Sequence, residues 1–249
     1  MSAWPRGTGR VHLPTVDSTN AEAARRAAAG EPGPLWITAT EQTAGRARRG
    51  RDWVCSDGNL FATLLLRPSM PPRDAALISF VACLAVADLA SVTPASVTLK
   101  WPNDVLVDRR KVAGILLESA GLSDRLEWLA VGIGVNLVGA PAMDQIRTDG
   151  TPAISLLEAG GPRLTPDAAL ERLAPAMAHW LGVFESQGFP PIRTAWLARA
   201  AHLGERIGAG LPNERLEGVF EAVDDSGNLV LNTASGPRRI AAAEIYFPE

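Results

Sequence analysis

The pattern of apolar residues changes near His202, and this change is what most limits the folds open to the chain. Before it, short apolar runs alternate with longer helical segments, which is typical of an α/β domain built on one sheet. After it, short β segments are joined by turn sequences such as Asp225-Ser226-Gly227. The sequence therefore predicts an α/β (α+β) domain over residues 1–202 and a small β-barrel over residues 203–249.

Apolar periodicity and turn residues give the expected elements. Strands are expected at 11–16, 35–40, 59–66, 97–101, 105–107, 112–117 and 128–137, and β segments of the small domain at 216–223, 228–232, 237–240 and 244–247. Helices are expected from Thr19 to Gly30 and at 73–91, 165–186 and 191–201. Thr19 and Glu22 have the spacing of a capping box, and Gly30 suits the C′ position.

An arginine-rich loop follows the second expected strand, where residues 42–53 read Gln-Thr-Ala-Gly-Arg-Ala-Arg-Arg-Gly-Arg-Asp-Trp. Guanidinium groups pair with carboxylates and phosphates through two parallel hydrogen bonds, and glycines let the backbone approach a ligand closely. The loop is basic although the whole chain has a net charge of −3. We interpret the loop as a clamp for a small anionic ligand. A solvated basic loop or a segment that binds nucleic acid is the alternative.

Composition narrows the classes of function. The net charge of −3 argues against general affinity for nucleic acid, which demands a broad basic surface. The longest apolar run is too short to span a bilayer, so no membrane association is expected. Cys55 and Cys83 are too few for a disulfide framework, which favours the cytoplasm. The three histidines show no metal-ligand spacing, so no metal site built by the protein alone is expected.

Four further segments carry polar side chains where expected strands or helices begin or end. They are residues 17–20 (Asp-Ser-Thr-Asn), 100–104 (Lys-Trp-Pro-Asn-Asp), 111–118 (Lys-Val-Ala-Gly-Ile-Leu-Leu-Glu) and 132–137 (Gly-Ile-Gly-Val-Asn-Leu). Taken alone, Lys100 and Lys111 could be ordinary surface lysines. Gly132 and Gly134 lack the third glycine and the acidic partner of a dinucleotide-binding loop, which favours close strand packing.

Together with the arginine loop, these segments closely resemble the bacterial biotin–protein ligases in order and spacing. The small β domain resembles the SH3-like C-terminal domain of that family, and the resemblance implies a mixed-sheet catalytic domain before it. One position departs from the family's Gly-Arg-Gly-Arg-Arg-Gly pattern, because Ala47 stands where the middle glycine is usual. If Ala47 needed a positive φ, the backbone would be strained by about 1 kcal/mol.

The resemblance implies a role for each matching residue. The expected biotin-binding residues are Ser18, Thr19, Asn20, Gln42, Gly45, Arg46, Ala47, Arg48, Lys111 and Gly114. The expected ATP-binding residues are Arg48, Arg51, Trp53, Asn103, Asp104, Lys111 and Asn136. The expected catalytic residues are Lys111, Arg48 and Asp104, the last as a candidate to accept a proton from the acceptor amine. Arg46, Ala47 and Arg48 would form the lid over the bound vitamin and its activated form.

The implied activity is ATP- and Mg²⁺-dependent formation of biotinyl-5′-AMP, followed by transfer of the biotinyl group to a lysine of a biotin carboxyl carrier protein domain. A lipoate or octanoate ligase on the same fold is one alternative, and a biotin-dependent transcriptional repressor is another. The first expected strand begins near Val11, which leaves no room before it for a DNA-reading module. An exposed sheet edge would also permit a homodimer.

Overall fold

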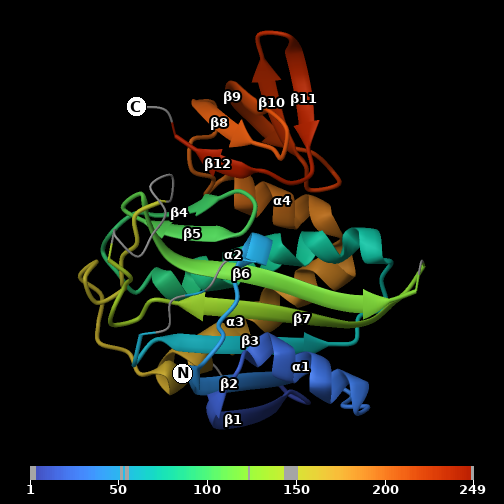
Figure 1. The fold of residues 1–249 in the computed structure, drawn as a ribbon, viewed down its shortest axis with the longest axis vertical. Coiled ribbons are helices and arrows are strands. Elements are labelled where there is room, and N and C mark those ends of the chain that lie inside the picture. The colour runs from blue at the N-terminus through green and yellow to red at the C-terminus, as the bar shows by residue number, and fades with distance from the viewer. Residues whose placement is uncertain (1–3, 51–52, 54–55, 123, 143–150, 248–249) are drawn as a thin grey trace.

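The computed structural model describes residues 4–50, 53, 56–122, 124–142 and 151–247 (Figure 1). A large α/β part contains most of the chain, and a smaller β part, coloured orange to red, lies at one end of the molecule (Figure 1). Within the described residues, no helix combines the length and apolar character that crossing a membrane requires.

The large part is built on a seven-stranded sheet with the order β1-β2-β3-β7-β6-β5-β4. β1 runs parallel to β2 and every other neighbouring pair is antiparallel, so the sheet is mixed, as predicted. Its strands are β1 (Gly9–Val16), β2 (Leu35–Gln42), β3 (Leu60–Leu66), β4 (Val97–Lys100), β5 (Asp104–Val107), β6 (Arg110–Gly121) and β7 (Leu126–Val135).

Helices cover both faces of this sheet. Side chains alternate along a strand, so Trp36 and Leu64 pack into the main core while Ile37 and Leu65 face the other side. α1 (Thr19–Ala28) covers that second side, and α2 (Ile78–Ala90), α3 (Pro166–Gln187) and α4 (Phe189–Leu197) form the main core. The short 3₁₀ helices are η1 (Arg48–Gly50) and η2 (Pro72–Leu77).

The start of α1 differs from the predicted capping box. Ser18 occupies the N-cap without a side-chain capping bond, and Thr19 is already helical. The hydroxyl of Thr19 instead donates to Gln42 Oε1, at 3.1 Å. The far end is as predicted, because Gly30 follows the C-cap residue with a φ of +90°. The Thr19 side chain therefore joins α1 to β2, while Glu22 pairs with Arg25 and Arg26 within the helix.

The small part is a five-stranded antiparallel sheet with the order β11-β10-β9-β8-β12. Its strands are β8 (Arg206–Gly210), β9 (Arg215–Val223), β10 (Leu229–Thr233), β11 (Gly236–Ile240) and β12 (Glu244–Tyr246). β8 was not predicted, because its two glycines suggest a loop. The ring of Tyr246, paired opposite Gly208, occupies the space that a side chain there would fill. Trp101 Nε1 donates to Gly227 O at 3.0 Å and so links the two parts.

Candidate active site

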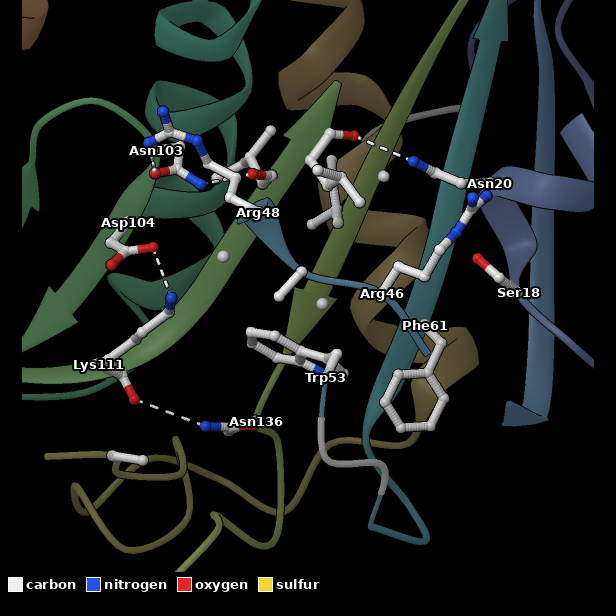
Figure 2. A pocket seen from close by; sticks show the side chains of 18 of the residues that line it. Ser18, Asn20, Arg46, Arg48, Trp53, Phe61, Asn103, Asp104, Lys111 and Asn136 are labelled. Atoms are coloured by element: carbon white, nitrogen blue, oxygen red, sulfur yellow. Dashed lines mark hydrogen bonds and ion pairs between the residues drawn. The ribbon is translucent and has the colours of Figure 1, made fainter. Parts of the chain in front are cut away.

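A cavity of about 510 Å³ brings the predicted segments together over β6 and β7 (Figure 2). The predicted residues that line it are Ser18, Thr19, Asn20, Gln42, Arg46, Ala47, Arg48, Trp53, Asn103, Asp104, Lys111, Gly114 and Asn136. Gly45 is buried in the arginine loop and does not line the cavity. Arg51 lies outside the described residues, as does Cys55. The chemical role of each residue stays a prediction.

A buried network of neutral side chains forms one end of the cavity. Thr63 on β3 is fully buried, and its hydroxyl lies 2.7 Å from Asn20 Oδ1 and 2.8 Å from Thr19 Oγ1. Thr19 N also donates to Gln42 Oε1, at 2.8 Å. Buried amides and hydroxyls need hydrogen-bond partners, and they accommodate a neutral polar ligand more easily than a charge. This end therefore suits an uncharged ring that both donates and accepts hydrogen bonds.

Two glycines on β7 make room for site side chains. A methyl group at Gly132 would overlap Asn20 Oδ1, and one at Gly134 would lie 2.6 Å from the Trp53 indole. The sequence favoured close packing between strands, whereas the nearest neighbours of these glycines are the side chains of Asn20 and Trp53. Glycine at these positions therefore lets the α1 terminus and the arginine loop approach the sheet.

The arginine loop is held across the cavity at several points. Arg46 Nη2 lies 3.2 Å from Glu118 Oε2, and Arg48 Nη1 donates to Asn103 Oδ1 at 3.1 Å. Trp53 N donates to Gly45 O at 2.9 Å. Ala47 is not among the described non-glycine residues with positive φ, so alanine there causes no left-handed strain. Figure 2 shows both arginines reaching over the site from one backbone segment.

The opposite end of the cavity is charged. Lys111 Nζ lies 2.6 Å from Asp104 Oδ1 and 5.5 Å from the centre of a Trp53 ring (Figure 2). Lys100 is buried and not a surface lysine, since only 8% of it is exposed. Its ammonium donates to Thr151 Oγ1 at 2.6 Å and lines the cavity. The cavity is therefore lined by two lysines, Lys100 and Lys111, and by the carboxylates of Asp104 and Glu244, and the lysines suit a ligand that carries negative charge.

Asn136 carries a buried acceptor that points to a ligand. Its Nδ2 donates to Ile154 O at 3.2 Å, which fixes the orientation of the amide. Its Oδ1 is buried and has no hydrogen-bond partner among the described residues. Leaving a buried polar atom unpaired costs about 1–3 kcal/mol. An amino or N–H group of a bound ligand would satisfy this oxygen.

Two further ionisable groups lie near the site. Hydrogen bonds from Arg25 lower the pKa of Asp17 from 3.8 to about 2, so this carboxylate stays ionised beside Ser18. Burial raises the pKa of the Cys83 thiol in α2, so Cys83 is not a nucleophile. Asp17 also accepts a backbone hydrogen bond from Ala44, at 2.8 Å. Asp17 thus joins the start of α1 to the arginine loop.

Known proteins share both the sequence and this fold. Residues 13–136 match the biotin/lipoate A/B protein ligase family, and residues 202–247 match the biotin protein ligase C-terminal domain. The biotin–[acetyl-CoA-carboxylase] ligase of Paracoccus denitrificans is 48% identical, with 94% of this chain and 99% of that protein covered. The enzyme of the same name from Mycobacterium tuberculosis is 30% identical, with 96% and 90% covered.

A solved structure of a biotin protein ligase has the same fold. Biotin protein ligase from Aquifex aeolicus, in complex with biotin and ATP, aligns with a TM-score of 0.80 and 25% identity, covering 95% of this chain and 97% of that chain. The resemblance found in the motifs is thus confirmed over nearly the whole length. The chain belongs to the biotin protein ligase family.

Proposed function

We propose that this protein activates biotin with ATP to give biotinyl-5′-AMP and transfers the biotinyl group to a lysine of a biotin carboxyl carrier protein domain. The observation that carries the proposal is the composition of the cavity. One end has a neutral hydrogen-bonding network, the other end has the Lys111–Asp104 ion pair, and two arginines lie across the space between them. The Aquifex aeolicus relative binds biotin and ATP in a structure of the same fold.

The neutral end suits the ureido ring of biotin. That ring offers one carbonyl acceptor and two N–H donors, and amides and hydroxyls provide both complementary types. Phe61, Ile115 and Ile133 line the cavity beside them and would contact the apolar part of the vitamin. The carboxylate of biotin would then lie toward Arg48 and Lys111.

The charged end suits the α-phosphate of ATP. Lys111 and Arg48 would neutralise charge as the biotin carboxylate approaches the phosphate, two anions that otherwise repel each other. Trp53 offers a ring face for stacking, and the unpaired Asn136 Oδ1 offers an acceptor for the amino group of adenine. We therefore assign Asn103 and Asn136 to the nucleotide side of the cavity.

Both chemical steps balance without another reactant. In the first, a carboxylate oxygen of biotin bonds to the α-phosphorus of ATP, and the bond from that phosphorus to pyrophosphate breaks. In the second, the acceptor amine attacks the carbonyl carbon, the bond to AMP breaks, and the amine loses a proton. The closed loop would keep water away from the anhydride between the steps.

Mg²⁺ is proposed to arrive with the nucleotide. Among the described residues, no group of three acidic, histidine or cysteine side chains could hold a metal ion. Mg²⁺ completes most of its shell with substrate phosphates and water, so the phosphates of ATP would hold it at the charged end of the cavity. When bound, Mg²⁺ would supply further positive charge against the phosphates. The low cysteine content favours the cytoplasm as the place of reaction.

Isotope exchange tests the proposal directly. Purified protein with ATP and Mg²⁺ should exchange labelled pyrophosphate into ATP when biotin is present. Exchange with lipoate or octanoate should be at least about a hundredfold slower, because these acids leave the polar atoms that bind the ureido group unpaired. Exchange with lipoate and none with biotin would instead establish the lipoate ligase alternative. Absence of exchange with every acid would refute the proposed function.

Substituting Gly132 with alanine should weaken biotin binding. The added methyl group overlaps Asn20, so we expect the KM for biotin to rise about tenfold and stability to fall by about 1–3 kcal/mol. Gly182→Ala is the matched control, because a methyl group there meets nothing within 4 Å. Pyrophosphate exchange and thermal unfolding measure the two effects. A Gly132→Ala enzyme with an unchanged KM would show that the Asn20 amide does not contact biotin.

A further inference from the structure

Glu118 on β6 contacts two parts of the site at once. Its Oε2 accepts a hydrogen bond from Asn20 Nδ2 at 2.7 Å and lies 3.2 Å from Arg46 Nη2. Asn20 belongs to α1 and Arg46 to the arginine loop, so one oxygen atom contacts both elements. Glu118 does not itself line the cavity, whereas both of its partners do.

The contact with Glu118 fixes the amide of Asn20. Asn20 Nδ2 donates its two hydrogens to Glu118 and to Leu116 O, the latter at 3.2 Å. Asn20 Oδ1 lies 2.7 Å from the donor Thr63 Oγ1. Two acceptors lie beside one end of the amide and one donor beside the other, so the amide has a single orientation. Asn20 lines the cavity, and an amide oxygen has the capacity to accept a second hydrogen bond, from a ligand.

The same carboxylate provides the countercharge for the loop. Arg46 and Glu118 have 46% and 31% of their side chains exposed, so water screens their ion pair. An exposed pair of this kind is weak when both partners are mobile, chiefly because two long side chains lose rotamer freedom. A ligand that hydrogen-bonds to the Asn20 oxygen strengthens the donation from the same amide to Glu118, so Glu118 is held more firmly and Arg46 loses less entropy in pairing with it.

We propose that Glu118 is a positioning residue that couples occupation of the biotin end of the cavity to closure of the arginine loop. This inference rests on the proposed function for the identity of the ligand. Because coupling between two sites is reciprocal, biotin should strengthen loop closure and loop closure should strengthen retention of biotin and its adenylate. Glu118 would thus act through Asn20 and Arg46 without touching the reacting atoms.

Two substitutions separate the two contacts. In Glu118→Gln the side-chain carbonyl still accepts from Asn20, but the charge that holds Arg46 is lost. We expect this variant to release biotinyl-5′-AMP about fivefold faster than the unchanged protein, because loss of a weak ion pair has an effect of that size. Its KM for biotin should stay within about twofold of the unchanged value. Glu118→Ala removes both contacts, and its KM for biotin should rise about tenfold as well. Glu127→Gln, an exposed glutamate on neighbouring β7, is the matched control and should match the unchanged protein.

Trypsin gives a second measurement that needs no catalysis. It cleaves after arginine, so loop opening is read as the rate of cleavage after Arg46 and Arg48. Without ligand, Glu118→Gln should be cleaved about fivefold faster than the unchanged protein. Biotin should protect the unchanged protein more strongly than this variant.

The two measurements can overturn the proposal separately from the function. Equal cleavage and equal release of the adenylate in Glu118→Gln and the unchanged protein would refute the coupling. Full additivity of the effects of Arg46→Gln and Glu118→Gln on adenylate release would also refute it, since partners in one contact show non-additive effects. If the unchanged protein makes no biotinyl-5′-AMP, the proposed function fails, and ligand-free cleavage still decides whether Glu118 holds the loop.

Discussion

Replacing Lys111 with alanine is expected to slow biotin-dependent exchange of pyrophosphate into ATP by about 10²- to 10³-fold, the usual effect of removing one fixed donor from a developing oxyanion. Lys111 Nζ lies at the charged end of the cavity, 2.6 Å from Asp104. Biotin affinity should change by less than about tenfold, because the neutral network at the other end stays intact.

Arg110→Ala is the control for Lys111→Ala. Arg110 precedes Lys111 on β6, but its guanidinium pairs with Glu158 at 2.7 Å and does not line the cavity. The control should exchange pyrophosphate at close to the unchanged rate, and calorimetry should show that both variants still bind biotin. Exchange by Lys111→Ala within tenfold of the unchanged rate would mean that another cation carries the charge of the transition state.

The sequence predicted the architecture because its signals are local. Apolar alternation and turn residues identify each strand of the large sheet within a few residues. The resemblance of the motifs to those of the biotin–protein ligases implies which segments share a site. β8 was missed because the packing of Tyr246 against Gly208 is a long-range event. The expected capping box was wrong for the same reason, since Gln42 on a neighbouring strand competes for the Thr19 hydroxyl.

The details of the site depend on strand register, which the sequence does not reveal. Strict alternation would place Lys111 and Gly114 on opposite faces of β6. The pairing of β5 with β6 shifts register between Val105 and Leu106, opposite Ala113 and Lys111, so β6 holds one extra residue. Such a bulge turns a side chain to the other face, and both residues can then line the cavity.

For some residues, the spacing along a strand already indicates which face of the sheet they share. Glu118 follows Gly114 by four positions, so regular alternation beyond the bulge places both on the same face of β6. Gly132 and Asn136 have the same spacing on β7 and just beyond it. Lys100 had no such signal, because its burial depends on Thr151 and on Phe247, whose ring centre lies 5.2 Å from the ammonium. Local motifs thus identified the site, and tertiary contacts decided which of its charges are buried.

Replacing Asp104 with asparagine is expected to reduce transfer of biotin from preformed biotinyl-5′-AMP by about 10²-fold or more at pH 7, a typical effect of losing a general base. A free lysine has a pKa of about 10.4, so only about one acceptor amine in a thousand is neutral at that pH. Asp104 has 16% of its side chain exposed at the charged end of the cavity, within reach of an amine that enters there. Pyrophosphate exchange should stay within about tenfold, because the first step needs no base.

The pH dependence distinguishes this role of Asp104 from the alternatives. As the pH rises toward the pKa of the acceptor lysine, the neutral fraction of the amine grows about tenfold per unit, so the deficit of Asp104→Asn should shrink in parallel. A deficit that is equal at every pH would show that Asp104 does not take the proton. If exchange falls as far as transfer and excess Mg²⁺ restores both, Asp104 serves instead as a carboxylate ligand for the metal on ATP. Asn103→Ala, the neighbouring substitution, should lower the affinity for ATP without this dependence on pH, since it removes a neutral hydrogen-bonding partner of Arg48.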